Sequence, residues 1–131
     1  MNGRASSLPH AILRIGTGLL FLQHGLQKLF GVLGGVPPSG GRVPLTSELG
    51  LAGILELGGG LLLVVGLATR PVAVLLMLEM IVAFSTVHMP MGGWPIQNGG
   101  ELALLYLIIF GFLATYGAGP VSADSYLRKN P

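Results

Sequence analysis

The fold is decided by residues 49–88, which read LGLAGILELGGGLLLVVGL–ATR–PVAVLLMLEMIVAFSTVH. Two continuously apolar stretches, 49–67 and 71–88, stand on either side of a three-residue turn. Each is long enough to cross a hydrocarbon layer as a helix, which needs ~20 residues within a range of ~17–25. Neither stretch alternates with a period of two, so helices are favoured over strands. Because the turn is short, we expect the two helices to be antiparallel neighbours.

Two further apolar stretches flank this hairpin. One runs from about Leu8 to Phe30, with Ser7 as a candidate N-cap and Pro9 in the first turn, where its missing N–H is tolerated. The other covers residues 99–116. The pattern predicts an all-α, polytopic membrane protein, a four-helix bundle that forms a single transmembrane domain over residues 1–131.

The connections carry signals for where the helices begin. Thr46-Ser47-Glu48 precedes the second helix, and Thr69 is the expected cap of the third. Asn98-Gly99-Gly100-Glu101 has the form of a capping box, with Glu101 at the third position of the last helix. We expect an irregular loop over residues 89–98, and after Gly117 only a short, polar tail.

The composition excludes whole classes of protein. Of the 131 residues, 51% are hydrophobic and only 9% are charged, against roughly a quarter charged in soluble domains. That excludes a soluble enzyme, a nucleic-acid binder and a disordered linker. The absence of cysteine excludes disulfides, Cys-ligated zinc, iron–sulfur clusters, thiol redox chemistry and c-type haem. We expect no signal peptide, because no small-x-small cleavage site closes the apolar run after Met1–Ser7.

Basic residues predict how the chain is oriented. With four spans, the N-terminus, the turn at 68–71 and the C-terminal tail share one side of the membrane. That side has the larger number of cations: Arg4, Arg14, Arg70, Arg128 and Lys129, against Lys28 and Arg42 on the other side. The positive-inside rule then places both termini in the cytoplasm, and we expect a multi-pass protein of the inner membrane.

A polar seam runs along the first helix. Arg14, Thr17, Phe21, His24 and Lys28 are spaced 3, 4, 3 and 4 residues apart, so they share one helical face. Such a face is expected to point into the bundle, since ionisable groups in a span are costly and are candidates for function. For Arg14 and Lys28 the alternative is snorkelling to opposite interfaces.

Glu56 is the most informative single residue. It lies inside the second helix with no cation near it in sequence, so it is either neutral or paired with another helix. At matching depth the first helix carries His24 and Lys28, and we predict a contact between Glu56 and that face. Glycines 58–60 would let a neighbouring helix or a flat ligand approach closely. A purely structural hydrogen bond between helices is the alternative.

The third helix carries two more ionisable residues. Glu79 falls in the cytoplasmic half, where Arg14 is expected at similar depth, so we predict an Arg14–Glu79 pair. His88 follows nine residues later, about 180° around a straight helix. The sequence therefore predicts that Glu79 and His88 point in different directions.

Three chemistries are compatible with the outer polar residues. His24 and His88 could ligate a b-type haem, and with Glu56 and Glu101 they could hold a transition metal, but neither has the supporting spacing. Histidine and carboxylate beside a glycine-rich wall suit a quinone, which needs hydrogen-bond partners within an apolar site. We therefore predict a quinone and neither haem, iron–sulfur cluster nor metal. The candidate binding residues are His24, Lys28, Glu56, Gly59, His88 and Glu101.

The chain resembles the DoxX family of small four-helix membrane proteins. The resemblance runs from the first helix to the end of the fourth and rests on these segments: Arg14-Ile15-Gly16, Leu20-Phe21, His24-Gly25, Lys28-Leu29, Glu56, Gly58-Gly59, Gly66-Leu67-Ala68-Thr69-Arg70, Ala83, His88, Gly100-Glu101 and residues 117–124. It implies a helical membrane subunit associated with redox or oxidative-stress complexes, and the namesake is linked to thiosulfate oxidation with electron delivery to quinone. The family is also similar to cysteine-dependent quinone-reducing proteins, whose activity is not implied for a chain without cysteine.

Two main functions are compatible with these observations. The first is a membrane subunit that docks a soluble or membrane oxidoreductase and offers a quinone-binding pocket for its electrons. The second is a scaffold or assembly subunit without chemistry of its own, whose buried polar residues only specify helix packing. A small-solute or proton conductor ranks behind both. The expected partners are membrane lipid, the oxidoreductase and a second copy of the chain, and not nucleic acid.

Overall fold

The computed structural model describes residues 3–130, and every regular element in that range is helical. Four helices carry most of the length: α1 (Gly3–Phe30), α2 (Glu48–Val65), α3 (Thr69–Ala83) and α5 (Glu101–Tyr116). The short elements are a π-helical turn η1 (Phe84–His88), a 3₁₀ turn η2 (Met89–Met91), α4 (Pro95–Asn98) and α6 (Ala123–Lys129).

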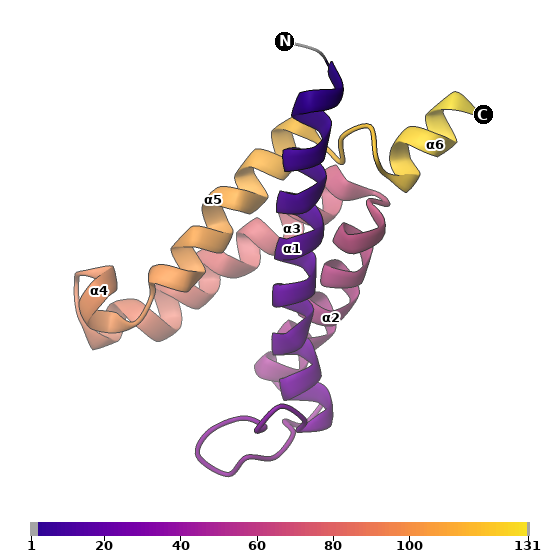
Figure 1. Cartoon of the computed structure of the whole chain (residues 1–131). Helices are drawn as coiled ribbons and strands as arrows, with labels where there is room; N and C mark the ends of the chain where they lie inside the picture. The colour runs from indigo at the N-terminus through magenta and orange to yellow at the C-terminus, as the bar shows by residue number, and fades with distance from the viewer. Residues whose placement is uncertain (1–2, 131) are drawn as a thin grey trace.

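The long helices form two antiparallel pairs. Helix α2 packs most extensively on α1, and α3 packs most extensively on α5. The two pairs converge toward the end of the molecule that carries both termini and diverge toward the other end (Figure 1). The turn between α2 and α3 lies at the end of the termini, while the 31–47 loop and α4 lie at the diverging ends (Figure 1). The chain path therefore has the up-and-down order that the sequence predicts, although its closure into a four-helix bundle stays a prediction.

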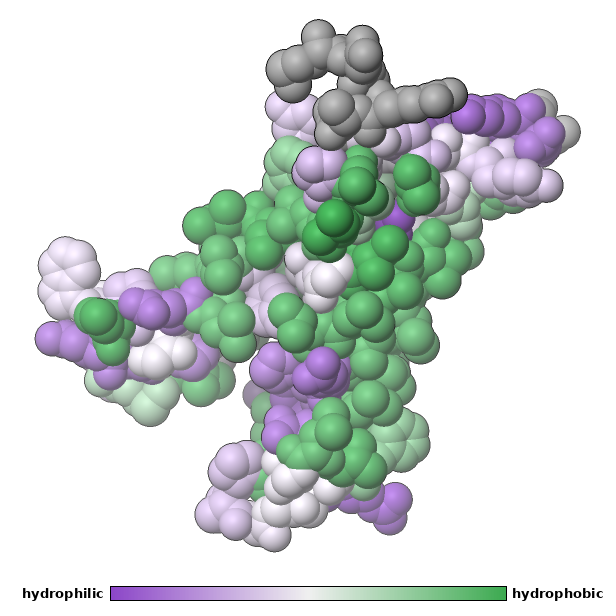
Figure 2. Space-filling view, in the orientation of Figure 1, coloured by the Kyte–Doolittle hydropathy of each residue, from purple (hydrophilic) through white to green (hydrophobic). Residues whose placement is uncertain are grey.

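Within residues 3–130, two helices are long and apolar enough to cross a membrane. They are Glu48–Val65 and the continuous helical segment Thr69–Met91. Helix α5 is apolar but has only 16 residues, and the 28-residue α1 carries the polar seam. Hydrophobic surface covers the middle of the molecule (Figure 2). Apolar side chains such as Leu20, Leu51 and Ile108 are more than half exposed, as expected of a lipid-facing surface.

Glycines bring α1 and α2 into close contact. A Cβ atom on Gly25 would lie 2.7 Å from the carbonyl oxygen of Gly53, and one on Gly18 would lie 2.7 Å from that of Gly60. Any larger residue would force the backbones apart, so this is a small-residue interface of the kind that membrane helices use. The predicted close approach beside Glu56 is thus confirmed for Gly60, whose neighbour is α1.

Phe21 joins the two helix pairs. It is 1% exposed, and its ring meets the rings of Tyr106 and Phe110 of α5 edge-on, each at a centroid distance of 4.9 Å. Such edge-to-face pairs are worth about 0.5–1.5 kcal/mol beyond the burial of their area. Leu63 of α2 and Leu76 of α3 belong to the same buried cluster. The inward direction predicted for the seam is confirmed for Arg14, Thr17 and Phe21, which are all buried.

Helix α1 begins earlier than the sequence indicates. It starts at Gly3, so Ser7 and Pro9 lie within it and the predicted N-cap at Ser7 is wrong. Pro9 is the seventh residue of this helix, so the expectation that it falls in the first turn is wrong as well, and the helix lacks the N–H bond that another residue would make there. The prediction that there is no signal peptide concerns a segment that begins at Met1, which lies outside the described residues. The side chain of Arg4 is also not among those described.

The other predicted caps have mixed outcomes. Ser47 caps α2 as predicted, since its hydroxyl accepts from Gly50 N at 3.0 Å. Thr69 is not the cap of α3 but its first residue, because Ala68 occupies the cap position with φ 50°. The capping box at Glu101 is also wrong: Gly100 is the N-cap of α5, and Asn98 ends α4 while its side chain accepts from Gly100 N at 2.8 Å.

A cluster of carbonyls surrounds Arg14, and we call it the Arg14 cluster. The side chain is 1% exposed and donates to Leu63 O and Val64 O near the end of α2, the latter at 2.8 Å. It also donates to Ala118 O at 3.0 Å and to Val121 O at 2.5 Å in the segment after α5. Carbonyls at a helix C-terminus lack helical partners and carry partial negative charge, so one guanidinium satisfies several of them at once. Arg14 thereby ties three parts of the chain together.

The C-terminal tail contains a helix that the sequence analysis missed. Ser122 caps α6, and the Asp124 carboxylate accepts from Ala68 N at 2.8 Å and from Thr69 N at 3.0 Å. Asp124 therefore supplies the cap of α3 from 55 residues away, where Ala68 has no side chain to do so. Gly66 closes α2 at φ 74° and leaves room for Arg14 Nη1, which would lie 2.8 Å from a Cβ atom at that position.

Candidate functional site

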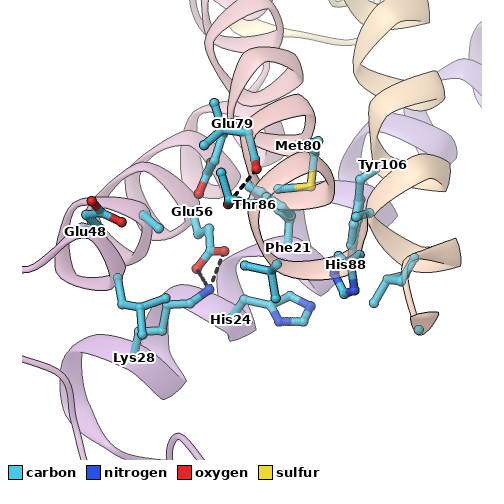
Figure 3. A pocket seen from close by; sticks show the side chains of 18 residues that line it. Phe21, His24, Lys28, Glu48, Glu56, Glu79, Met80, Thr86, His88 and Tyr106 are labelled. Carbon is cyan, nitrogen blue, oxygen red and sulfur yellow. Dashed lines mark hydrogen bonds and ion pairs between the residues drawn. The ribbon is translucent and has the colours of Figure 1, made fainter. Parts of the chain in front are cut away.

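A cavity with mostly apolar walls and a group of ionisable side chains opens between the two helix pairs where they diverge, and we call it the polar cavity. Its volume is about 450 Å³, within the range of roughly 300–1,000 Å³ typical of ligand pockets. Side chains reach it from α1, α2, α3, η1 and α5 (Figure 3). The lining residues are Phe21, His24, Lys28, Glu48, Leu49, Ala52, Glu56, Glu79, Met80, Val82, Ala83, Thr86, Val87, His88, Gly99, Leu102, Ala103 and Tyr106.

The charges in this cavity are unevenly distributed. The whole chain has five acidic residues, and three of them, Glu48, Glu56 and Glu79, line the cavity. Lys28 is the one lysine or arginine among the lining residues. A cationic chain has thus placed most of its acidic groups around one small space within its helices.

Lys28 and Glu56 form an ion pair across α1 and α2. The ammonium of Lys28 lies 2.5 Å from one carboxylate oxygen of Glu56 and 2.6 Å from the other (Figure 3). The pair is largely shielded, with side-chain exposures of 18% and 6%. The predicted contact of Glu56 with this face of the first helix is confirmed. Close backbone packing at Gly25 and Gly53 is what lets the two side chains meet.

Glu79 lies on the cavity and not at the other end of the molecule. Both of its carboxyl oxygens are buried and have no hydrogen-bond partner among the described residues. The predicted Arg14–Glu79 pair is therefore wrong, because the guanidinium of Arg14 donates its hydrogen bonds to backbone carbonyls. The membrane depth of Glu79 was estimated by counting residues along a helix parallel to α1. That estimate is wrong because α3 is tilted relative to α1 (Figure 1).

His88 reaches the same cavity as Glu79, against the prediction. A straight helix would place the two residues about 180° apart, but residues Phe84–His88 form a π-helical turn. Such a turn takes more residues per revolution and so changes the helical phase, and turns of this kind are frequent at functional sites. The Nδ1 of His88 donates to the carbonyl of Asn98 at 3.0 Å, so in the neutral ring Nε2 is left as an acceptor.

His24 has an aromatic environment. Its ring centroid lies 6.3 Å from that of Phe21 and 6.1 Å from that of Tyr106. It makes no hydrogen bond to the part of the chain that the structure describes, and its nitrogens are free to bond a ligand. Phe21, Met80 and Tyr106 are buried and form an apolar wall beside it.

The mouth of the cavity is apolar. Leu49, Val82, Val87 and Leu102 all line the cavity and are between 46% and 59% exposed, so they form its rim. An amphiphile with a polar head and an apolar tail matches this arrangement, because its tail would meet apolar side chains.

Comparison with known proteins gives the family. The sequence model of the DoxX family matches residues 10–89. The chain belongs to the DoxX family. The matched part of this DoxX chain includes Lys28, Glu56, Glu79 and His88, but not Tyr106. Membership in this membrane-associated family agrees with the apolar helices and exposed apolar surface described above.

Relatives are found in two bacteria. A Haemophilus influenzae protein described as uncharacterized is 38% identical over 123 residues, which cover 91% of this chain and 90% of the relative. The Bacillus subtilis protein named "Putative oxidoreductase CatD" is 34% identical over 119 residues, 90% of this chain and 86% of the relative. A second uncharacterized H. influenzae protein is 30% identical over 135 residues, covering 98% of this chain and 89% of the relative. No solved structure matches the DoxX chain.

Four of the six predicted site residues line the cavity: His24, Lys28, Glu56 and His88. Gly59 and Glu101 do not. A Cβ atom on Gly59 would lie 2.8 Å from the Leu76 side chain, so this glycine serves the packing of α2 on α3. Glu101 is exposed at the first position of α5.

Sequence reasoning missed Glu79 and Tyr106 as members of this site. Glu79 was assigned to the wrong end of the molecule, while Tyr106 carried no signal beyond being an aromatic residue in an apolar run. Among residues 3–130, no three histidine, aspartate or glutamate side chains gather in a way that could hold a metal ion.

Proposed function

We propose that this DoxX chain is the membrane subunit of a redox complex, docking a soluble oxidoreductase and binding a quinone head group in the polar cavity. In this proposal His24, Lys28, Glu56, Glu79 and His88 surround the polar end of the ligand, and Phe21, Met80 and Tyr106 contact its ring. The single observation that carries the proposal is the buried Glu79 carboxyl, which lacks a partner within an otherwise apolar-walled cavity of about 450 Å³. A buried polar group without a partner is costly, so a ligand that supplies one binds favourably.

Two further facts support a redox role. The rim of Leu49, Val82, Val87 and Leu102 suits the apolar tail of a membrane quinone. The relative CatD carries the word oxidoreductase in its name. A bound quinone would supply the electron-accepting chemistry, while the chain's own residues would orient the head group, exclude water and hold protons at the Glu79 carboxyl and the His24 ring.

A direct binding measurement tests the cavity. Purified protein in lipid nanodiscs is titrated with a decyl-substituted benzoquinone. We expect Glu56→Gln and His24→Ala each to weaken binding about tenfold or more. Gln23→Ala is the matched control for His24→Ala, because Gln23 is exposed on the adjacent position of α1. Equal affinity of the wild type, Glu56→Gln and His24→Ala would rule out a quinone site in this cavity.

The oxidoreductase partner requires a second measurement. Purification from native membranes in a gentle detergent, followed by protein identification, is expected to recover a soluble flavin- or metal-containing oxidoreductase with the chain. Recovery of the chain alone, with quinone binding intact, would reduce the proposal to a quinone-binding protein without this partner.

The proposed topology has four membrane crossings in the inner membrane with both termini in the cytoplasm. The arrangement of both termini and the α2–α3 turn at one end supports it, as does the presence of Arg70, Arg128 and Lys129 at that end. Because the chain has no cysteine, single cysteines report on each side cleanly. With a membrane-impermeant thiol reagent on intact spheroplasts, we expect Ser39→Cys to be labelled and Asn130→Cys to be protected. The opposite pattern would invert the topology.

The scaffold function is the second candidate, and the Arg14 cluster favours it. There a buried ionisable residue serves packing alone, with all its bonds made to the chain's own backbone. If the scaffold explanation also holds for the cavity, Glu56→Gln and His24→Ala lower the yield of assembled complex. Quinone binding by the isolated chain is then either the same in the wild type and both variants or absent from all three.

A further inference from the structure

The hydrogen-bonding groups of the polar cavity favour one redox form of its ligand over the other. This inference rests on the proposed function, since it concerns the same cavity and the same class of ligand. A quinone carries two carbonyl oxygens, which only accept hydrogen bonds. Its reduced form, the quinol, carries two hydroxyl groups, which both donate and accept. The polar atoms that the cavity leaves without partners therefore discriminate between the two.

Glu79 contributes acceptors. Both of its oxygens are buried and have no donor among the described residues, although they line a cavity that contains a lysine. An ionised carboxylate only accepts, whereas a protonated one donates through one oxygen and accepts through the other. A hydroxyl group can satisfy Glu79 in either protonation state, but a carbonyl oxygen can satisfy it only when the carboxyl is protonated.

The donors that would attract a carbonyl are mostly engaged. Lys28 directs its ammonium at both oxygens of Glu56, at 2.5 and 2.6 Å, which uses two of its three N–H groups. The hydroxyl of Thr86 donates to Val82 O at 2.8 Å, and the Nδ1 of His88 donates to Asn98 O at 3.0 Å. What His88 offers the cavity in its neutral form is an acceptor, Nε2.

Tyr106 and His24 do not change the excess of free acceptors over free donors in the cavity. Neither makes a hydrogen bond to another residue between 3 and 130, and each can donate or accept according to the ligand. Of the remaining groups, Nε2 of neutral His88 only accepts and one N–H of Lys28 only donates, while Glu79 offers an acceptor oxygen in either protonation state.

We propose that the cavity holds the dihydroxy, reduced form of a quinone in preference to the oxidised form, with Glu79 as the residue that sets this preference. Glu79 accepts from one ligand hydroxyl. The remaining Lys28 N–H, His24 and Tyr106 are available to the other polar groups of the ring.

The experiment compares two probes that differ only in redox state, decyl-benzoquinone and decyl-hydroquinone, the latter kept reduced under anaerobic conditions. The ratio of their dissociation constants is measured for the wild-type chain in nanodiscs. We expect the hydroquinone to bind at least about tenfold more tightly. Tenfold corresponds to about 1.4 kcal/mol, the order of the free energy of leaving one buried acceptor unpaired.

Glu79→Gln tests the residue assignment. The amide places two N–H donors where the carboxyl was, so it can bond a carbonyl oxygen. We expect the ratio to fall to about one or to reverse, because quinone binding improves and hydroquinone binding weakens. Glu101→Gln is the control with the same chemical change outside the cavity, and its ratio is expected to match that of the wild type.

The outcomes separate the two proposals. If the wild type binds both probes equally, or the quinone more tightly, this inference is wrong while the quinone cavity stands. If neither probe binds, the proposed function fails and the inference fails with it. If Glu79→Gln keeps the wild-type ratio, Glu79 does not set the preference.

Infrared difference spectroscopy of the wild type covers the case in which Glu79→Gln does not fold. Adding hydroquinone is expected to shift a carboxyl or carboxylate stretching band. An unchanged spectrum with bound hydroquinone would overturn the assigned contact.

Discussion

The Arg14 cluster and the polar cavity bury the same kinds of side chain in opposite ways. Arg14 is 1% exposed, and its guanidinium makes hydrogen bonds to four carbonyls of the chain. Glu79 has two buried oxygens and no partner among residues 3–130. The fold supplies hydrogen-bond partners for the Arg14 guanidinium, whereas the Glu79 carboxyl is left to bond a ligand. In this chain the buried carboxyl that the fold leaves unsatisfied is the one that points to a ligand, whereas the satisfied Arg14 is explained by packing.

The two regions also differ in what surrounds them. Around Arg14 the chain closes tightly, because Gly66 and the segment at 117–122 pack directly on the guanidinium. Around Glu79 the helix pairs diverge and leave a cavity of about 450 Å³ (Figures 1 and 3). Convergence at one end fixes the four long helices to each other, and divergence at the other end creates space for a ligand.

Removing Arg14 is expected to have the largest effect on stability. Arg14→Met leaves buried carbonyls without donors, each worth about 1–3 kcal/mol, and disconnects α1 from the end of α2. We expect little or no monodisperse protein in detergent. Arg128→Met is the control, since Arg128 is an exposed arginine at the same end. A well-folded Arg14→Met protein, with the thermal midpoint of the wild type, would show that the cluster is not the joint described here.

Breaking the ion pair of the cavity from one side is expected to have the next largest effect. Lys28→Met leaves the Glu56 carboxylate buried without its cation, and losses of about 3–5 kcal/mol are typical of such changes. The double variant Lys28→Met/Glu56→Gln removes the stranded charge as well and is expected to recover much of the loss. Thermal unfolding of the wild type, both single variants and the double variant measures the coupling. Additive losses would mean that the pair is not coupled.

The tail contact at Asp124 is expected to have a moderate effect. Asp124→Ala removes the acceptor for Ala68 N and Thr69 N, and losing a helix cap costs about 1 kcal/mol. Asp124→Asn keeps one carbonyl oxygen and is expected to lie between Asp124→Ala and the wild type in thermal midpoint. An unchanged midpoint in Asp124→Ala would show that α6 does not hold the α2–α3 turn.

The smallest effect on stability is expected for Glu79→Gln, which sharpens the contrast with Arg14. No hydrogen bond to a described residue is lost, so the change should be within about 1 kcal/mol and can be stabilising, as at other functional residues that a fold leaves unsatisfied. The thermal midpoint of the ligand-free protein in nanodiscs measures it. A loss as large as that of Lys28→Met would mean that Glu79 is a structural residue.

Much of the first helix could be predicted from sequence because its signal is local. The 3-4-3-4 spacing from Arg14 to Lys28 places these residues on one face of any α-helix, and the structure buries Arg14, Thr17 and Phe21 as expected. The contact of Glu56 with Lys28 could be predicted as well, since α1 and α2 are antiparallel and their depths could be counted from a shared end. Both inferences need only helical geometry and one hairpin.

The partners of Glu79 and His88 could not be predicted in the same way. Their direction depends on the π-helical turn at Phe84–His88, which no residue in that stretch signals, and on the tilt of α3 away from α1. Arg14 could be expected to need partners, but which ones it finds depends on where the chain passes after α5. The role of Asp124 as the cap of α3 is likewise set by two segments that lie far apart in sequence.

The sequence by itself determined that this is a helical protein with apolar helices and a polar seam, because composition and helical periodicity are properties of neighbouring residues. Only the tertiary structure decided that Arg14 is enclosed by carbonyls while Glu79 faces a cavity. The physical reason is that hydrogen-bond satisfaction inside a protein depends on distances between separate helices, which the angle between the two helix pairs and one π-helical turn control.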